Sequence, residues 1–356
     1  MSAPPGSETA LTAADPPRLG ERLRAAVQTR AFLVAVVVAV LVGLYAGGVA
    51  AGASAEHLAS LTAWGLMLGG IIALGSIGLT LVYGVLKFPN FSHGALVTLG
   101  AYVTLTVMAL LPAGRALAPL SFGYELIVGV IVAMPVVGIV SLAVDRVVYR
   151  RLRRTNAHLV LFAMASLAML FLLQSIIYLG WGPEFHFYYP GRPNPALALP
   201  FGIRVRADQL FILGLGIVLM FAVAALLEWT RMGKAMRATA DNPDLARIRG
   251  IDTERVIAWT WMLGGALAAT GGTMYGLSSQ LRPEMGFWLL LPMFAAVIMG
   301  GIGSAYGAMV AALIVGVAHQ VSSSFLNPTY GPAVAFVLMV LTLIIRPQGL
   351  FGRPEG

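Results

Sequence analysis

The sequence contains no cysteine, and charged residues are scarce. Without cysteine, neither a disulfide nor a thiolate metal site can form. Charged residues make up 11% of the 356 residues, where a soluble domain has about 25%, and hydrophobic residues make up 58%. So few charges cannot cover a surface with hydrated side chains. The composition therefore indicates an all-α, polytopic integral membrane protein.

Catalytic motifs are also missing. The sequence has no G-x-x-x-x-G-K-[ST] phosphate loop, no H-E-x-x-H zinc motif and no G-x-S-x-G nucleophile motif. We expect a chain that is not an enzyme, with no catalytic residues, no metal and no cofactor. If it takes part in active transport, another chain must hydrolyse the ATP.

Acidic residues are absent from the middle of every predicted span. Glu125, Asp208 and Glu228 lie only at span ends. Ion-coupled carriers usually need ionisable side chains inside the membrane as relays or ion sites. This absence argues against a secondary transporter.

Apolar stretches of about 20 residues, the length of a membrane-spanning helix, follow one another along the chain. They lie near 31–50, 64–86, 91–111, 124–144, 157–179, 208–228 and 256–278. The region 288–346 is also apolar, but glycines at 300–303 and Asn327-Pro328 interrupt it. It holds either one span plus a re-entrant pair or three spans. We therefore expect about 8–10 transmembrane helices, including broken or re-entrant segments.

The basic residues are distributed unevenly between the two faces of the membrane. With the N-terminus placed in the cytoplasm, eighteen of the 23 Lys and Arg residues fall in cytoplasmic segments and five fall outside. Cytoplasmic loops carry such an excess. Both termini are therefore predicted to be cytoplasmic.

The predicted organisation has four parts. Residues 1–30 lack a periodic pattern and are expected to form a disordered cytoplasmic tail. Residues 31–56 form the first span or, alternatively, a signal peptide cleaved after Ala55. Residues 57–348 form the transmembrane domain, with a polar loop at 229–256, and residues 349–356 form a cytoplasmic C-terminal tail.

The polar loop contains the signals of a short helix. We expect the preceding helix to continue from Glu228 to Ala240 and to stop at Asp241. Asn242 is then a good N-cap and Pro243 suits the first helical turn. The short helix is predicted over 243–249.

Gly250 is expected to end this helix in the left-handed conformation, and Asp252 to cap the next helix. A helix of seven residues is marginal alone, so we expect contact with another protein to stabilise it. A solvated connector between two spans is the alternative.

A first break in the apolar pattern is "KFPNFSHG". Pro89 is expected to end one helix, and Asn90 or Ser92 to cap the next. Such breaks often border the permeation path of transporters. We predict that Asn90, Ser92, His93 and Gly94 lie beside the path near its cytoplasmic end. The alternative is a tight turn at the inner surface.

A second break is "GGIGS", with Gly300, Gly301, Gly303 and Ser304. Successive glycines permit positive φ and expose N–H groups. A helix that starts here would present its N-terminus to a pore and would attract a carboxylate. Alternatively, the glycines only let helices pack closely.

Four separated segments, in the same order, resemble one family: the branched-chain amino acid ABC permeases of the LivH type. The resemblance covers roughly residues 60 to 356. The segments are "IGLTLVYGVLKFPNFSHG" (Ile77–Gly94), "GKAMRATADNPDLARIRGI" (Gly233–Ile251), "MFAAVIMGGIGSAYGAMV" (Met293–Val310) and "RPQGLFGRPE" (Arg346–Glu355).

The resemblance implies the permease subunit of an ABC importer in a bacterial cell (inner) membrane. Its path would carry branched-chain or other amino acids. The implied partners are a second related permease subunit, two cytoplasmic ATPase subunits and an extracytoplasmic substrate-binding protein. The polar loop is similar to the family's ATPase-docking loop. The residues implied in docking are Gly233, Arg237, Asp241, Asn242, Pro243, Asp244, Gly250 and Ile251.

The sequence departs from the family pattern at three places. Ala95 follows "HG" where an acidic residue is common, Lys87 stands in an otherwise uncharged part of its motif, and the first 55 residues have no counterpart in shorter members. The first two departures leave the substrate open, and the third leaves the number of spans open. Two alternatives also stay open. One is a urea- or amide-specific ABC permease of the same family, and the other is an ion-coupled secondary transporter or channel.

Overall fold

The chain is almost entirely helical in the computed structural model, which describes residues 30–112, 114–191 and 196–352. One short antiparallel hairpin interrupts the helices, formed by β1 (Ala196–Ala198) and β2 (Arg204–Arg206). The all-α prediction is therefore confirmed. The predicted tail at 1–30 lies almost wholly outside the described residues, as do the last four residues of the C-terminal tail.

Seven long helices occupy the positions of the first seven predicted spans. They are α2 (Arg30–Ala50), α3 (Ala55–Leu86), α4 (Ser92–Leu110), α5 (Tyr124–Val144), α7 (Leu159–Trp181), α8 (Ala207–Trp229) and α11 (Thr253–Ser278). The first of these is present as a helix. Cleavage after Ala55 stays a prediction. N-terminal sequencing of the mature chain would test it, because a cleaved chain would begin at Glu56.

The apolar region at the C-terminal end forms three helices. They are α12 (Met285–Gly300), α13 (Ala305–Ser322) and α14 (Gly331–Ile345), the last preceded by the 3₁₀ turn η3 (Pro328–Tyr330). The sequence allowed either one span plus a re-entrant pair or three spans in this region, and the structure has three helices. At 16 residues, α12 is shorter than the about 20 residues that cross a bilayer.

Eight helices of the described chain are long and apolar enough to cross a membrane. The 26-residue helix α11 is not among them, because glycine, threonine and tryptophan interrupt its apolar residues. It packs instead against α3, α4 and α5. A helix shielded from lipid on several sides needs less apolar sequence than one that faces the bilayer.

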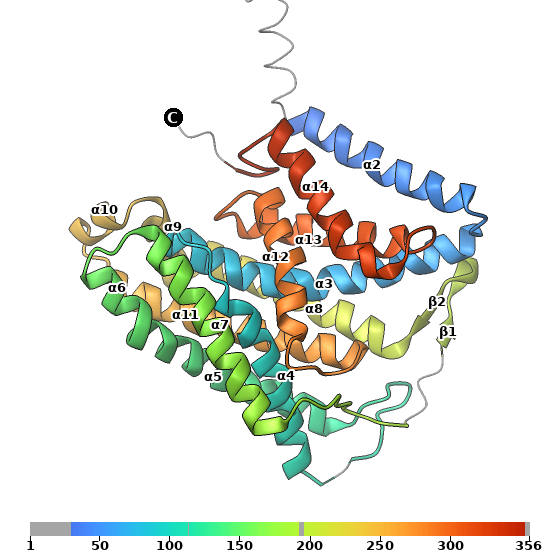
Figure 1. Cartoon of the computed structure of the whole chain (residues 1–356), viewed down its shortest axis with the longest axis horizontal. Coiled ribbons are helices and arrows are strands. Elements are labelled where there is room, and N and C mark those ends of the chain that lie inside the picture. The colour runs from blue at the N-terminus through green and yellow to red at the C-terminus, as the bar shows by residue number, and fades with distance from the viewer. Residues whose placement is uncertain (1–29, 113, 192–195, 353–356) are drawn as a thin grey trace, which may run out of the picture.

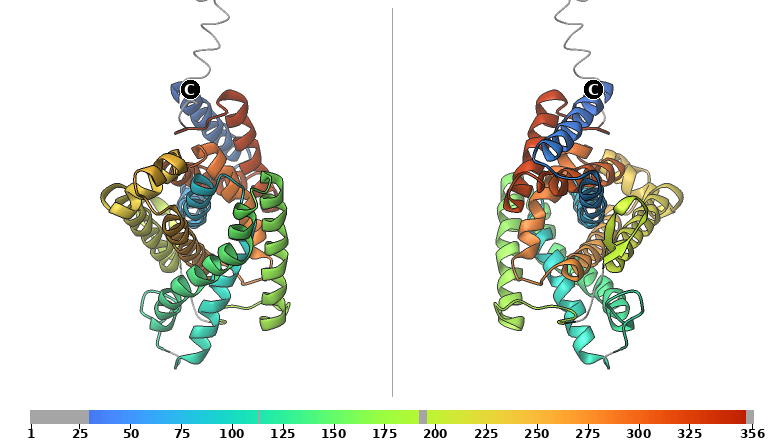
Figure 2. Two further views of the ribbon diagram at one scale, coloured as in Figure 1. Left: turned by 90° about the vertical axis from the view of Figure 1, so that its left-hand side faces the viewer. Right: turned by 90° about the vertical axis from the view of Figure 1, so that its right-hand side faces the viewer.

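Helix α3 forms the centre of the molecule (Figures 1 and 2). In its most apolar stretch, 89% of the residues are buried, and α8, α11, α12 and α13 pack around it. Glycine makes the closest of these contacts possible. A Cβ atom on Gly65 would lie 2.6 Å from the Val317 Cα, and one on Gly69 would lie 2.7 Å from the Leu313 Cα. Small residues at such crossings let helix backbones touch.

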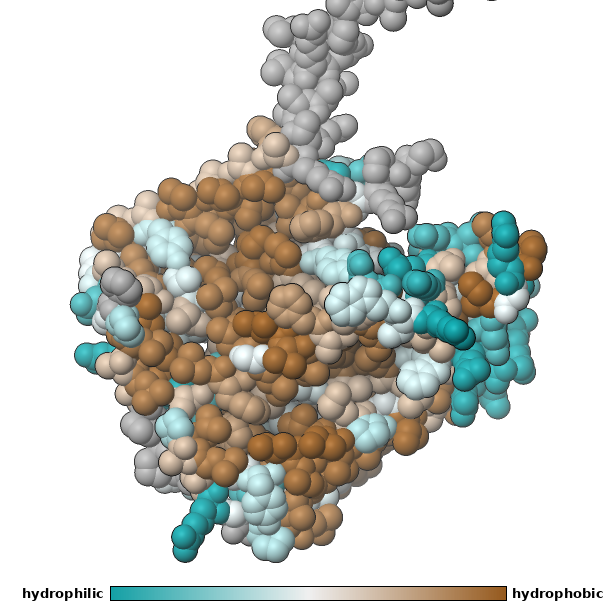
Figure 3. Space-filling model, turned by 180° about the vertical axis from the view of Figure 1, so that it is seen from behind, coloured by the Kyte–Doolittle hydropathy of each residue, from teal (hydrophilic) through white to brown (hydrophobic). Residues whose placement is uncertain are grey.

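Helices α2, α7, α8 and α14 lie at the periphery. Between 17% and 28% of the residues in their apolar stretches are buried within the chain. Figure 3 shows the broad apolar surface that results on one face of the molecule. These faces are suited to lipid or to other membrane subunits.

The two ends of the helix bundle differ in character. At one, the α10 end, lie α9 (Arg231–Asp241), α10 (Pro243–Ile248) and α6 (Arg150–Arg154), and the β1–β2 hairpin marks the opposite, hairpin end (Figure 1). Polar residues gather at the α10 end (Figure 3). Its exposed basic side chains include Arg231, Lys234, Arg237, Arg247 and Arg249. This is the end for which the distribution of charge predicts a cytoplasmic location.

Candidate functional site

The connection between α8 and α9 is a sharp corner rather than a continuous helix. The prediction of one helix from Glu228 to Ala240 was wrong, because α8 ends at Trp229 and Thr230 caps α9. The Thr230 hydroxyl accepts a hydrogen bond from the Gly233 backbone N–H at 2.9 Å. Gly233 itself is buried, and a Cβ there would meet the α8 backbone at Leu226 and Leu227. This residue therefore shapes the corner and is not free to touch a partner.

The predicted signals of the short helix α10 are confirmed. The Asn242 side chain accepts hydrogen bonds from the backbone N–H groups of Asp244 and Leu245, at 3.1 and 2.9 Å, and Pro243 occupies the first turn. Gly250 ends the helix with φ of +82°. The helix closes one residue earlier than predicted, at Ile248.

Helix α10 exposes two large apolar side chains. Leu245 is 51% exposed and Ile248 is 81% exposed. Residues three apart lie on the same helical face, so the two form one small apolar surface. The side chains of Arg237 and Asp241 on α9, and of Arg249 at the end of α10, are also exposed. A helix whose only function was to connect two spans would gain nothing from exposing an apolar pair to water.

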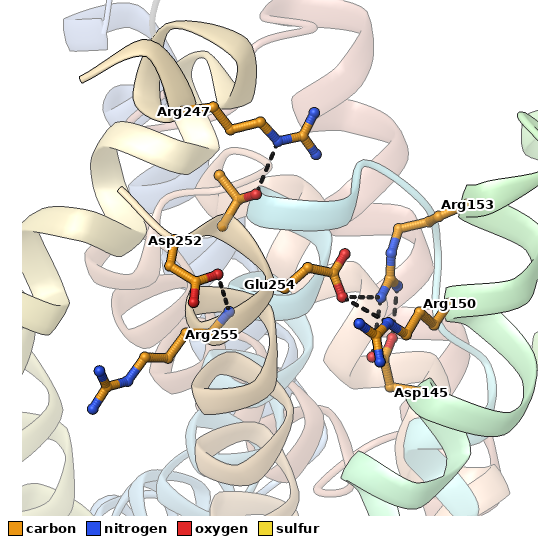
Figure 4. Close-up of polar contacts among 8 residues, drawn as sticks. Asp145, Arg150, Arg153, Arg247, Asp252, Glu254 and Arg255 are labelled. Atoms are coloured by element: carbon orange, nitrogen blue, oxygen red, sulfur yellow. Dashed lines mark hydrogen bonds and ion pairs between the residues drawn. The ribbon is translucent and has the colours of Figure 1, made fainter. Parts of the chain in front are cut away.

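A rigid joint connects α10 with α11. The Arg247 Nε donates to the Thr253 Oγ1 at 3.0 Å, and the Asp252 side chain accepts from the Arg255 backbone N–H at 3.1 Å. The Ile251 backbone N–H also closes the end of α10, on the Ala246 carbonyl at 3.0 Å. The Arg247 hydrogen bond thus links α10 directly to the first residue of α11 (Figure 4).

Charged side chains fasten that first turn to α6. The Arg150 Nε lies 3.0 Å from a carboxylate oxygen of Glu254, and an Arg153 nitrogen lies 4.0 Å from the same oxygen. Arg153 also binds both carboxylate oxygens of Asp145, at 2.6 and 3.0 Å. Figure 4 shows the four side chains converging between the two helices. In the sequence these arginines indicate only the topology, and no local pattern pairs them with Glu254 or Asp145.

The first break turns inward after α3. Lys87 is exposed and ends α3 in the left-handed conformation, with φ of +58°. The following residues Phe88, Asn90, Ser92 and His93 are then buried, with exposed fractions of 0–1%. The segment thus folds back into the protein instead of turning at its surface.

The expected side-chain cap of α4 was wrong. Phe91 is the capping residue, and no side chain accepts a hydrogen bond from the first turn. Instead, the Ser92 Oγ donates to the Asn90 Oδ1 at 2.6 Å, and the Tyr149 hydroxyl lies 3.2 Å from the Ser92 Oγ. The Asn90 Oδ1 and the Ser92 Oγ are therefore engaged with each other and with Tyr149, whereas the Asn90 Nδ2 has no hydrogen-bond partner among the described residues.

His93 and Gly94 contact two other helices. The His93 Nε2 lies 2.9 Å from the Gly75 carbonyl oxygen in the middle of α3. A Cβ on Gly94 would lie 2.8 Å from the Gly286 carbonyl oxygen of α12. In this conformation Asn90, Ser92 and His93 are at most 1% exposed, so these side chains do not line a space open to solvent.

The second break lies at the α10 end. Gly301 and Gly303 have φ of +103° and +83°, as their positions in a tight turn require. The Ser304 hydroxyl caps α13 by accepting from the Gly307 N–H at 3.1 Å, as predicted.

The chain around residue 350 covers this turn. The Leu350 N–H donates to the Met299 carbonyl at 2.8 Å, and the Phe351 N–H donates to the Gly300 carbonyl at 3.0 Å. The third and fourth of the segments that carry the family resemblance are therefore packed together.

Helix α3 brings the two breaks close together. The first break contacts Gly75, and the Gly303 N–H donates to the Thr80 Oγ1 at 3.1 Å. Five residues of helix span about 7.5 Å. The candidate path residues therefore lie along one short stretch of α3, although their roles stay a prediction.

An apolar groove lies between α5, α8, α9 and α11. Its volume is about 410 Å³. Its lining includes Met134, Pro135, Met232, Met236, Trp259 and Leu263. None of the candidate path residues borders it.

Comparison with known proteins gives one family. The family described as "Branched-chain amino acid transport system / permease component" matches residues 61–343. The LivH permease of the high-affinity branched-chain amino acid transport system of Escherichia coli (strain K12) is 32% identical over 296 residues, which cover 82% of this chain and 94% of that protein.

Other organisms contain similar proteins. The permease BraD of Pseudomonas aeruginosa is 31% identical, over 82% of this chain and 94% of that protein. A probable LivH of Methanocaldococcus jannaschii is 29% identical, over 79% and 89%. No solved structure matches the chain.

Proposed function

Because the chain belongs to the family of permease components of branched-chain amino acid transport systems, we propose that it forms part of an amino-acid path across a bacterial inner membrane. As a family member it is a non-catalytic membrane subunit of an ABC transporter, and it is a multi-pass protein. We further propose that α10 receives force from an ATPase subunit and that the α10 end is cytoplasmic.

The exposed face of α10 is the observation that supports docking most directly. Leu245 and Ile248 offer an apolar contact, and charged side chains surround it. An apolar centre with a polar rim is typical of protein interfaces. Of the residues implied in docking, Arg237, Asp241, Asp244 and Gly250 are exposed, whereas Gly233 supports the loop from inside.

The joint between α10 and α11 gives the docking surface a mechanical use. The Arg247–Thr253 hydrogen bond joins the two helices, and the Ile251 N–H closes the end of α10 on the Ala246 carbonyl. A push on α10 then becomes a tilt of α11, which packs directly on the central helix α3. Conformational change by small movements of packed helices is a known device of switching proteins.

The path itself is proposed to pass beside the two breaks. Asn90, Ser92, His93 and Gly94 lie on one of them, and Gly300, Gly301, Gly303 and Ser304 on the other. Both contact α3 within about 7.5 Å of each other. The first break is buried here, so we expect a path beside it to open only with the movement that ATP hydrolysis would drive.

The proposed assembly contains partners that carry the remaining functions. A second related permease chain would complete the path, and two cytoplasmic ATPase subunits would supply the force. An extracytoplasmic binding protein would select the amino acid. The absence of a phosphate loop in this sequence agrees with ATP hydrolysis on separate chains.

Single cysteines test the docking surface, because the chain contains none. In the assembled transporter, Leu245→Cys and Ile248→Cys should each crosslink to an ATPase subunit. They should also resist reagents that reach only the outer face. Phe187→Cys is the matched control, since Phe187 is 50% exposed and lies near the hairpin end. It should label from outside and should not crosslink.

Two results would contradict the proposal. Outside labelling at 245 or 248 would reverse the orientation. Uptake that persists after ATP depletion, with an imposed membrane potential, would favour a channel or an ion-coupled carrier. Uptake of urea or amides instead of amino acids would leave the mechanism intact and change only the substrate.

A further inference from the structure

The docking helix and the first break are connected through a third element. The long helix of α5 continues through the π-helical turn η1 (Asp145–Tyr149) into α6. This continuous rod contacts α11 through Arg150, Arg153 and Tyr149, and it contacts the first break through Tyr149. The contacts form an unbroken chain from α10 to Asn90.

The π turn brings the first pair closer into line. Eight residues of α-helix, the separation of Asp145 and Arg153, make about 2.2 turns, which would leave the two side chains about 80° apart around the helix. A π turn contains more residues than an α turn, so the same eight residues come to about two turns. The two side chains then share a face and form their two-fold hydrogen-bonded pair.

The Asp145–Arg153 pair helps to hold the arginines of α6 beside α11. The Arg153 side chain is 19% exposed and that of Asp145 is 4% exposed. Arg150 and Arg153 both reach Glu254, which is the second residue of α11. Movement of the α11 terminus must either carry α6 with it or break the Glu254 contacts.

Two turns further along α11, an aromatic contact repeats the connection. Trp261 follows Glu254 by seven residues and therefore lies on the same helical face. Its ring stacks on Tyr149, with the planes 9° apart and the centroids 5.1 Å apart. Tyr149 also packs against Phe88, at a centroid distance of 5.0 Å.

The Tyr149 hydroxyl completes the chain of contacts. It lies 3.2 Å from the Ser92 Oγ and donates to the Asn90 Oδ1 at 3.4 Å. Two buried donors at this place, the Asn90 Nδ2 and the Trp261 Nε1, have no hydrogen-bond partner among the described residues. Buried donors are nearly always paired in a settled structure. A second arrangement that pairs them would be favoured when the site moves.

We propose that Glu254 and Tyr149 act as positioning residues that transmit the displacement of α10 to the first break. This inference rests on the proposed function, because it assumes that an ATPase moves α10. In it, the cluster of Asp145, Arg150, Arg153 and Glu254 pulls the rod along with α11. Tyr149 then displaces Ser92 and Asn90, and the break opens.

The experiment measures amino acid transported per ATP hydrolysed in the complete transporter, reconstituted in vesicles. Glu254→Gln removes the charge and Tyr149→Phe removes the hydroxyl, and both variants retain side-chain volume. Each should lower the ratio roughly three- to thirty-fold, the range expected for residues that couple two sites. ATP hydrolysis itself should continue.

A charge exchange separates coupling from simple damage. The double variant Arg150→Glu with Glu254→Arg restores an ion pair with reversed sign, and it should recover most of the ratio lost in Glu254→Gln. Arg151→Gln is the matched control. Arg151 is an exposed neighbour on the same helix and forms no ion pair among the described residues, so its ratio should stay unchanged.

The outcomes distinguish this inference from the proposed function. If Leu245→Cys and Ile248→Cys crosslink to the ATPase and transport requires ATP, docking is supported. If the ratio then stays normal in both Glu254→Gln and Tyr149→Phe, the transmission role is wrong. If crosslinking fails and ATP is not needed, the proposed function itself is wrong.

Discussion

Asn242 and Asn90 each stand beside a proline, yet the protein uses them in opposite ways. Asn242 precedes Pro243, is exposed, and caps a helix with two hydrogen bonds. Asn90 follows Pro89, is fully buried, and caps no helix. Its side chain accepts hydrogen bonds from Ser92 and Tyr149.

The order of the two residues accounts for part of the difference. An asparagine before proline is held extended, the conformation that an N-cap needs. Asn90 has its proline on the other side, and the chain there leaves α3 through the left-handed Lys87. The same residue types therefore make an outward-facing helix in the polar loop and an inward-folded segment at the break. Four substitutions test this comparison.

The largest effect is expected where the break meets α12. In Gly94→Val the new side chain would press on the Gly286 carbonyl oxygen, which is backbone and cannot yield. Overpacking typically costs about 1–3 kcal/mol and sometimes more, and a contact with backbone leaves little room to relax, so much less folded protein should be recovered from detergent. Gly214→Val is the control, because a Cβ at Gly214 meets nothing within 4 Å. Equal yields of the two variants would contradict the packing argument.

Asn90→Ala is expected to lower the stability of the whole protein, by less than Gly94→Val does. The change removes the acceptor for the Ser92 and Tyr149 hydroxyls in a buried site. A buried polar group left unpaired costs about 1–3 kcal/mol. The midpoint of thermal unfolding in detergent should fall. A midpoint equal to that of the unaltered chain would mean that the buried hydrogen bonds do not stabilise the fold.

Gly250→Val should act locally, on the polar loop. A valine at φ of +82° is strained by roughly 1–2 kcal/mol, although nothing lies within 4 Å of the added Cβ. We expect transport to fall about ten-fold while ATP hydrolysis continues and insertion is normal. Gly250→Asn, which tolerates positive φ better, should retain most transport. Normal rates in Gly250→Val would show that the end of α10 need not be rigid.

The smallest effect is expected for Asn242→Ala. Loss of an N-cap costs about 1 kcal/mol, and here it falls on one short exposed helix. The unfolding midpoint should hardly change, but crosslinking at 245 and 248 should weaken because α10 frays. Comparison with Asn90→Ala is decisive. If the unfolding midpoint were lower for Asn242→Ala than for Asn90→Ala, Asn242 and not Asn90 would be the residue that stabilises the whole fold.

Sequence patterns located the helices well because hydropathy is a property of each segment alone. The caps at Asn242, Asp252 and Ser304 were predicted for the same reason, since each depends on neighbours within three residues. The corner at Thr230 was missed. Its signal was present, because threonine is a good N-cap, but the apolar and polar patterns on either side ran together without a gap.

The candidate site could be predicted only in part. Gly233 was grouped with the docking residues by its motif, yet its lack of a side chain serves the packing of α9 on α8. The pair of Glu254 and Arg150 could not be found, because about a hundred residues separate the two. Only the packing of α11 against the rod of α5, η1 and α6 brings them within 3.0 Å.

By itself, the sequence determined that the chain is a helical membrane protein without catalytic groups. It also located the turns whose conformation depends on local hydrogen bonding and backbone sterics. The tertiary structure alone decided which polar residues are buried, that the weakly apolar α11 packs inside the bundle, and how α10 connects with the first break. The physical reason is that burial and side-chain pairing depend on surfaces supplied by segments far apart in the chain, whereas hydropathy and capping depend on neighbours.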